Sequence, residues 1–125
     1  SEKFDHVLVD APCSGTGTLR RNPEIKWRLT APDLNALLKI QKIILRNASN
    51  AVKKGGYLTY CTCSILPVEN DEVIRHFLAD NSQFIVCTPA ETILGNLMDS
   101  HGFFRTYPHR HNMDGFFGAM LRRRI

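Results

Sequence analysis

The sequence predicts an α/β fold, in which parallel strands are covered by helices and an antiparallel pair of strands lies at one edge of the sheet. The main observation is that short apolar runs alternate with amphipathic segments, in the order strand, helix, strand, helix, strand over residues 6–87. A second observation is that two strand-like segments, 102–107 and 115–121, flank a single loop near the end of the chain. With 125 residues, the chain has the length of one domain.

Composition and charge narrow the class of protein. The chain is 43% hydrophobic and 22% charged, as in ordinary globular domains. Since it has neither a signal peptide nor an apolar run near the roughly 20 residues that span a bilayer, we expect a cytoplasmic protein without a membrane partner. Its net charge of +4 favours an anionic partner.

Reactive side chains lie at the end of the first predicted strand, residues 6–10, and in the glycine-rich turn that follows it. The strand ends at Asp10, and Pro12 and Cys13 follow directly. The second predicted strand, residues 57–62, ends in the same way next to Cys63. Because parallel strands share the carboxyl edge of a sheet, where ligands bind, we expect these side chains to converge if the two strands are neighbours.

The first predicted helix lies between these strands. Thr30 is a capping hydroxyl, Pro32 is tolerated in the first turn and Asp33 follows three residues after the cap. Lysines and glycines at 53–56 predict the end of the helix, with cations near the negative end of its dipole and a glycine cap. The expected buried face repeats at three- and four-residue steps: Leu34, Leu37, Leu38, Gln41, Ile44, Leu45, Ala48 and Val52.

A second helix is predicted after the turn at residues 64–67. Its first turn is rich in acids, Glu69, Asp71 and Glu72, which suit the positive end of a helix dipole. The helix ends at 80–82, and a third strand covers 84–87, where Cys87 is a small core residue. A short helix is expected around 93–98. The buried face of the second helix is predicted to consist of Val73, Ile74, Phe77 and Leu78.

A basic segment follows the Cys13 turn and is a candidate nucleic-acid contact. It combines Arg20, Arg21, Lys26 and Arg28 with the indole of Trp27. Cations suit phosphates, and an aromatic ring suits a stacked base. The alternative is an ordinary solvated loop.

A metal site is not expected. Zinc sites favour two short-spaced pairs of ligands, and the four cysteines do not supply two such pairs. His109 and His111 form a close pair, but they have no cysteine or carboxylate partner at ligand spacing. Without a secretory context, disulfides are not expected either.

The combination of an acid, two thiols and a basic aromatic segment suits methylation of a pyrimidine at position 5. That carbon is a weak nucleophile, so a thiolate first adds to C6 and makes C5 enamine-like. An acid at N3 of the ring would stabilise the adduct, and a second thiol could assist its later elimination.

At these motifs the sequence resembles the RNA 5-methylcytosine methyltransferases of the Nop2/Sun group. Residues 10–17 are similar to the fourth methyltransferase motif of that family and residues 62–64 to its sixth. The similarity covers essentially the whole chain. It extends through Arg21-Asn22-Pro23, Lys26-Trp27, Gln41, Gly55-Gly56, Pro67, residues 69–72, Pro108-His109 and residues 114–117.

The resemblance implies roles for the site residues. Cys63 would be the nucleophile that attacks C6 of the target cytosine, and Cys13 would help to release the methylated product. Asp10 is implied to lie where the S-adenosylmethionine site meets the flipped base, and Pro12 to border the cofactor. The implied partner is an rRNA or a tRNA, contacted by the basic segment at 20–28.

The resemblance also implies that residues 1–125 form the carboxy-terminal half of a Rossmann-like class I methyltransferase domain. The glycine-rich turn and the acidic residue of the nucleotide-binding half are not in this sequence. We therefore expect the chain to be inactive or weakly active alone. Cys61 departs from the expected small or hydroxyl residue. Strand alternation puts it on the same face as Cys63, where it could compete or oxidise, and packing is the favoured interpretation.

Three other functions are weighed. A DNA 5-cytosine methyltransferase would use Cys13, which follows Pro12, as its nucleophile, but residues 62–64 and 108–117 fit that family poorly. An amino-group methyltransferase is disfavoured, because its Asn/Asp-Pro-Pro-aromatic turn is absent at 10–13. The third is a non-catalytic RNA-binding or interaction module with inert thiols.

Overall fold

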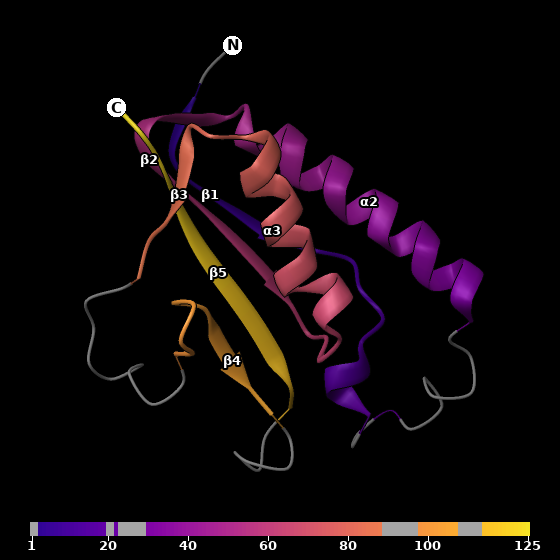
Figure 1. The fold of residues 1–125 in the computed structure, drawn as a ribbon. Helices are drawn as coiled ribbons and strands as arrows, with labels where there is room; N and C mark the ends of the chain where they lie inside the picture. The colour runs from indigo at the N-terminus through magenta and orange to yellow at the C-terminus, as the bar shows by residue number, and fades with distance from the viewer. Residues whose placement is uncertain (1–2, 20–21, 23–29, 89–97, 108–113) are drawn as a thin grey trace.

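The computed structural model describes residues 3–19, 22, 30–88, 98–107 and 114–125. Within these ranges a mixed sheet carries two α-helices, α2 (Ala31–Ser49) and α3 (Asp71–Asp80), on one face (Figure 1). Two short 3-10 helices, η1 (Thr16–Thr18) and η2 (Pro67–Glu69), follow the first two strands. The strands are β1 (Phe4–Asp10), β2 (Val52–Thr62), β3 (Phe84–Val86), β4 (Phe104–Thr106) and β5 (Phe116–Arg123).

The strand order is β1-β2-β5-β3, with β4 also paired to β5. β1 and β2 are parallel, and β5 runs antiparallel to β2, β3 and β4. The α/β class with flanking helices is thus confirmed, but the predicted place of the antiparallel pair at the edge is wrong for β5, which lies inside the sheet. The reason is its apolar content: Phe117, Ala119 and Leu121 are fully buried, as in a strand with neighbours on both sides.

Helix α2 begins as predicted and ends earlier. The Thr30 hydroxyl accepts a hydrogen bond from the Asp33 amide, but the helix stops at Ser49, capped by Asn50. The lysines and glycines at 53–56, predicted to end the helix, belong to β2 instead. Gly55 has a φ of 80°, and the β1–β2 register shifts beside it, so the glycines form an irregularity in the strand.

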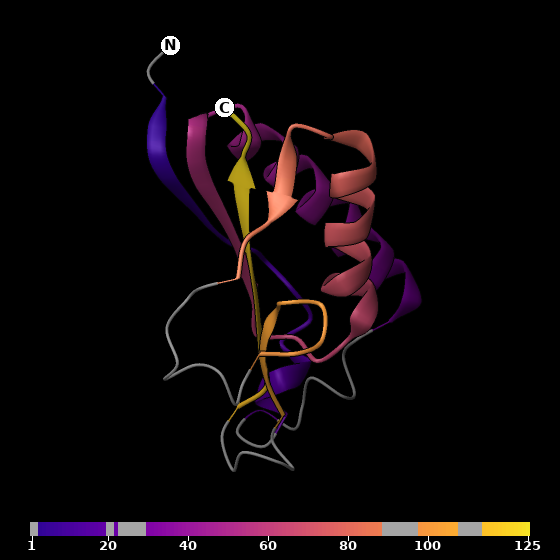
Figure 2. The same cartoon turned by 60° about the vertical axis from the view of Figure 1, so that its left-hand side comes forward.

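The core lies between the sheet and its two helices (Figure 2). Alternate residues of β2 point into it, and Leu58 and Tyr60 are fully buried there. Helix α2 contributes Leu45, and α3 contributes Ile74 and Phe77. This matches most of the predicted helix faces, because the three- and four-residue spacing selects the side that packs on the sheet.

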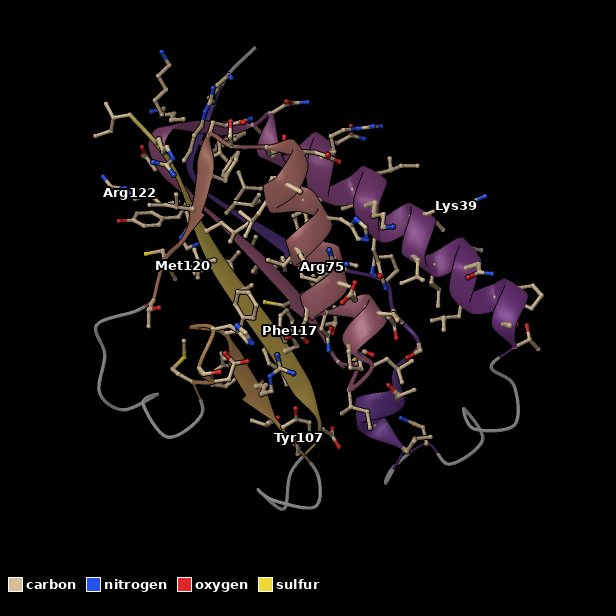
Figure 3. All side chains as sticks on the ribbon, in the orientation of Figure 1. Lys39, Arg75, Tyr107, Phe117, Met120 and Arg122 are labelled. Atoms are coloured by element: carbon tan, nitrogen blue, oxygen red, sulfur yellow. The ribbon has the colours of Figure 1, made fainter. Side chains whose placement is uncertain are left out.

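The other face of the sheet carries no helix among the described residues (Figure 2). Figure 3 shows Met120 and Arg122 extending from β5 on the side away from the helices. On β1, Phe4 is 53% exposed and Leu8 is 66% exposed. An apolar hollow on this face is lined by residues of β2, β4 and β5 and the segment before β4: Thr59, Cys61, Met98, Gly102, Phe104, Phe116, Gly118, Ala119 and Met120.

Some predictions concern residues outside the described ranges. These are the basic segment with Arg20, Arg21, Lys26, Trp27 and Arg28, the pair His109 and His111, and all of the expected helix at 93–98 except Met98. Met98 forms an isolated bridge with Phe104. In the part of the chain that the structure describes, no helix is long and apolar enough to cross a membrane.

Candidate active site

Two turns that leave neighbouring parallel strands meet at one edge of the sheet. Asp10 at the end of β1 is in register with Cys61 of β2, and the Ala11 amide donates to the Cys61 carbonyl at 2.9 Å. The chain then leaves both strands in the same direction. The predicted convergence of the Cys13 and Cys63 turns is therefore confirmed.

The two thiols are in contact. The Sγ atoms of Cys13 and Cys63 lie 3.4 Å apart, within hydrogen-bonding distance for sulfur, and both residues are half-buried. Burial raises the pKa of the Cys13 thiol from 9.0 to about 12. The Gly15 backbone partly opposes this effect, and Cys63 adds to it. The Cys13 thiol therefore stays protonated near neutral pH and can donate a hydrogen bond to the Cys63 sulfur.

Asp10 and Pro12 border the same edge, and both are exposed. The Pro12 carbonyl accepts a hydrogen bond from Gln41 Nε2 at 2.9 Å, which ties the turn to α2. Their exposure leaves Asp10 and Pro12 accessible to a ligand.

Cys61, which is in register with Asp10, contributes to the apolar hollow. Burial raises the pKa of the Cys61 thiol, and the negative charge of Asp10 raises it further.

Glu69 is a site residue whose role the sequence did not reveal. It was predicted as one of the acids that open the second helix, but it ends η2 and its side chain is fully buried. Its carboxylate accepts hydrogen bonds from the amide and hydroxyl of Ser14, from Gln41 and from Ser64. The sequence offered one signal for this role: Glu69 lies six residues after Cys63, within the segment that resembles the family.

Asn70 holds the Cys63 turn from both sides. Its side-chain amide donates to the Ser64 carbonyl at 2.8 Å and accepts from the Thr62 hydroxyl at 2.6 Å. The residues before and after Cys63 are thus fixed by one buried side chain. This role too was not predicted from the sequence.

Gly17 joins three segments of the site. Its amide donates to the Cys63 carbonyl at 2.8 Å, and its own carbonyl accepts from the Gly115 amide at 2.7 Å. A Cβ atom at Gly17 would lie 2.2 Å from the Gly115 carbonyl oxygen and 2.6 Å from that of Cys63. The close approach of these backbones therefore requires glycine.

The described residues contain no group of three or more histidines, cysteines or acids that could hold a metal ion. The arrangement supports nucleophilic chemistry, because two thiols are in contact. Asp10 is exposed at the same edge of the sheet, and the buried side chains of Glu69 and Asn70 hold the two cysteine turns by hydrogen bonds.

A family model supplies the deciding comparison. The model for the 16S rRNA methyltransferases RsmB/F matches residues 1–122. The chain belongs to the RsmB/F family. The resemblance to the Nop2/Sun group is thereby confirmed.

Curated members of the RsmB/F family are similar over nearly the whole chain. Ribosomal RNA small subunit methyltransferase B of Vibrio vulnificus is 42% identical over 120 residues, which is 96% of this chain and 26% of that protein. The probable ribosomal RNA small subunit methyltransferase B of Bacillus subtilis is 39% identical, over 99% of this chain and 28% of that protein. The chain thus spans about a quarter of the length of these relatives.

Two solved structures superpose on nearly the whole chain. NSun6 from Pyrococcus horikoshii with SFG superposes with a TM-score of 0.81 and 26% identity, over 98% of this chain and 30% of that one. A methyltransferase homologue from the same organism superposes with a TM-score of 0.75 and 29% identity, over 98% of this chain and 40% of that one. The Rossmann-like methyltransferase fold is thereby confirmed.

Proposed function

We propose that this chain carries the nucleophile of an RNA cytosine-5 methyltransferase that acts on ribosomal RNA. The observation that carries the proposal is the contact between Cys13 and Cys63 at the shared carboxyl edge of β1 and β2, 3.4 Å apart. Membership of the RsmB/F family supports ribosomal RNA as the substrate class. We also propose a cytoplasmic location.

Cys63 is the proposed nucleophile. Its thiolate forms a bond to C6 of the cytosine, and the electron pair of the C5–C6 double bond moves toward N3, which gains a proton. C5 of the resulting enamine would take a methyl group from a sulfonium donor, whose sulfur would keep the electron pair of the broken S–CH3 bond. N3 then releases the proton that it gained. Loss of the C5 proton to a base expels the Cys63 thiolate and restores the C5–C6 double bond.

Cys13 has the complementary role. Because its raised pKa keeps it protonated, Cys13 can donate the hydrogen bond to Cys63 and is a poor competing nucleophile. A donor at this place stabilises the thiolate of Cys63, both before attack and when it leaves C6. This supports a role for Cys13 in the release of product.

The proposed methyl donor is S-adenosylmethionine, which supplies an electrophilic methyl group when bound. Exposed polar atoms at the carboxyl edge fit such a ligand, and Asp10 and Pro12 are the exposed residues of the Cys13 turn that would border it. NSun6 from Pyrococcus horikoshii was solved with SFG, an analogue of S-adenosylmethionine. Asp10 would also lie at the junction with the flipped base.

We further propose that residues 1–125 are the carboxy-terminal part of the catalytic domain. Among the described residues, nothing pairs with the outer edge of β1, and Phe4 and Leu8 are exposed there. Such an edge and face suit further strands and helices. The rest of the cofactor site would lie in them, and Arg20, Arg21, Lys26, Trp27 and Arg28 remain the proposed RNA contacts.

The experiment is a transfer assay with methyl-labelled S-adenosylmethionine and small-subunit rRNA. We expect the longest natural protein that contains the chain to produce labelled 5-methylcytidine, and its Cys63→Ala variant to produce none. The 125-residue chain alone should bind the cofactor only weakly in calorimetry. Label on DNA but not RNA would favour a DNA enzyme, and RNA binding without label a non-catalytic module. Tight stoichiometric binding of the cofactor by the chain alone would contradict its proposed partial nature.

A further inference from the structure

We propose that Glu69 is a positioning residue that holds Cys13 and Cys63 at their working separation. The inference rests on the proposed function of the same site, because it assigns Glu69 a role in the chemistry of these two thiols. Glu69 itself contacts neither sulfur in the described structure. It acts through the residues that follow each cysteine.

The hydrogen bonds of Glu69 use both of its carboxylate oxygens as acceptors. Its Oε1 atom accepts from the hydroxyls of Ser14 and Ser64, and its Oε2 atom accepts from the Ser14 amide and Gln41 Nε2, both at 2.8 Å. The Ser14 amide and the Gln41 side-chain amide can only donate through these nitrogens. A glutamine at position 69 keeps only one side-chain oxygen. Its NH2 group would either face the two nitrogen donors or force the hydroxyls of Ser14 and Ser64 to accept instead of donate.

The connections of Glu69 reach both cysteine turns. Ser14 directly follows Cys13, and Ser64 directly follows Cys63, so each thiol is one residue away from a ligand of the same carboxylate. Gln41 closes the network, because its Nε2 atom also donates to the carbonyl of Pro12. The two turns, which come from different strands, are thus fastened to one buried group.

The carboxylate is itself held rigidly. The Tyr60 hydroxyl, from the buried face of β2, donates to the backbone carbonyl of Glu69 at 2.8 Å and so fixes the backbone that carries the carboxylate. Asn70, the next residue, fixes Thr62 and Ser64 on either side of Cys63. A rigid anchor matters because a misplacement of about 1 Å in a catalytic group can reduce a rate by about 100-fold.

The test compares Glu69→Gln with Glu72→Gln in the longest natural protein that contains the chain. Glu72 is a matched control: it undergoes the same chemical change three residues away, but its side chain is 44% exposed and forms an ion pair with Arg75. Two readouts are measured on protein that circular dichroism shows to be folded. One is the rate at which diamide, which accepts the two thiol hydrogens, joins Cys13 to Cys63. The other is kcat and KM for methyl transfer.

We expect Glu69→Gln to slow formation of the Cys13–Cys63 disulfide by about tenfold or more and to lower kcat with little change in KM for RNA. Glu72→Gln should leave both rates unchanged. If folded Glu69→Gln protein forms the disulfide at the wild-type rate and retains its kcat, Glu69 is not a positioning residue.

A second variant keeps the test decisive if Glu69→Gln does not fold. Ser64→Ala removes one donor and leaves the carboxylate in place, and we expect it to slow the disulfide by roughly threefold. An unchanged rate would contradict the proposal. If wild-type protein forms the disulfide quickly but transfers no methyl group, the proposed function fails while the positioning role is still measured by the disulfide alone.

Discussion

The protonated thiol of Cys13 is a residue-scale feature of the candidate site. Cys13 lies in contact with Cys63, and burial raises the pKa of Cys13 to about 12. A thiol that stays protonated can donate a hydrogen bond but attacks poorly, because the thiolate is the nucleophile. The burial of Cys13 thus supports its proposed role as the assisting thiol.

This raised pKa makes the stability of the fold depend on alkaline pH. Between pH 9.0 and about 12 the unfolded chain loses the Cys13 proton while the folded chain keeps it. The unfolded state therefore binds fewer protons, and the free energy of unfolding falls as pH rises through this window. The raised pKa values of Tyr60 and Cys61 act in the same direction.

Urea unfolding from pH 8 to 11 measures this effect. We expect Cys13→Ser to lose stability less steeply than wild type above pH 9, because serine does not titrate there. Ser82→Ala, which changes an exposed residue that does not titrate, is the control and should keep the wild-type slope. Equal slopes for wild type and Cys13→Ser would show that Cys13 is not protonated as described.

At the same scale, the sequence predicted that the Cys13 and Cys63 turns converge, but not which residues support them. Asp10, Cys13 and Cys63 stand at strand ends, where a polar side chain in a turn signals chemistry. Glu69 and Asn70 were missed because an acid and an amide near a helix start have an ordinary explanation as capping or dipole residues. Their burial depends on the Cys13 turn folding over them, which is a long-range contact that local patterns do not contain.

At the scale of elements, Arg105 fastens β4 to helix α3. Its guanidinium forms ion pairs with Asp71 at 2.7 Å and Asp99 at 2.9 Å and lies 5.0 Å from the centre of the Phe117 ring. The Arg105 side chain is 16% exposed, so its ion pairs with both acids form in a largely desolvated place. The short strand β4 is thereby held next to β5.

We expect Arg105→Met to lower the free energy of unfolding by about 3 kcal/mol, because it leaves Asp71 and Asp99 without their cation. Chemical denaturation measures the loss. Arg75→Met is the control: Arg75 pairs with Glu72 on the exposed side of α3 and should give no measurable change. Similar losses in the two variants would mean that the Arg105 cluster does not fasten β4.

The elements themselves were predictable where local signals agree. Thr30 and Pro32 marked the start of α2, and the apolar spacing identified its buried face. The end of α2 was misplaced because lysines followed by glycines are typical of a helix terminus. Here Gly55 instead adopts its positive φ within β2, where the register with β1 shifts. Strand pairing decided between the two outcomes, and it is not a local property.

At the scale of the whole molecule, the sheet is covered on one face and open on the other within the described residues. Helices α2 and α3 cover one face of the sheet. On the opposite face lie the exposed side chains of Phe4 and Leu8 from β1 and the apolar hollow that Cys61 helps to line. The order of strands was only partly predictable, because β5 inserts between β2 and β3 although it comes last in the chain. This insertion places Gly115, just before β5, against Gly17 and completes the site.

The most direct test of the central claim, that Cys63 and not Cys13 attacks the base, is covalent trapping on RNA that contains 5-azacytosine. The longest natural protein that contains the chain is compared with its Cys13→Ala and Cys63→Ala variants, with S-adenosylmethionine present, and the adduct is detected as a denaturation-resistant complex. We predict that Cys63→Ala forms no adduct, whereas Cys13→Ala still forms it. An adduct that persists in Cys63→Ala and disappears in Cys13→Ala would contradict the assignment of the two thiols.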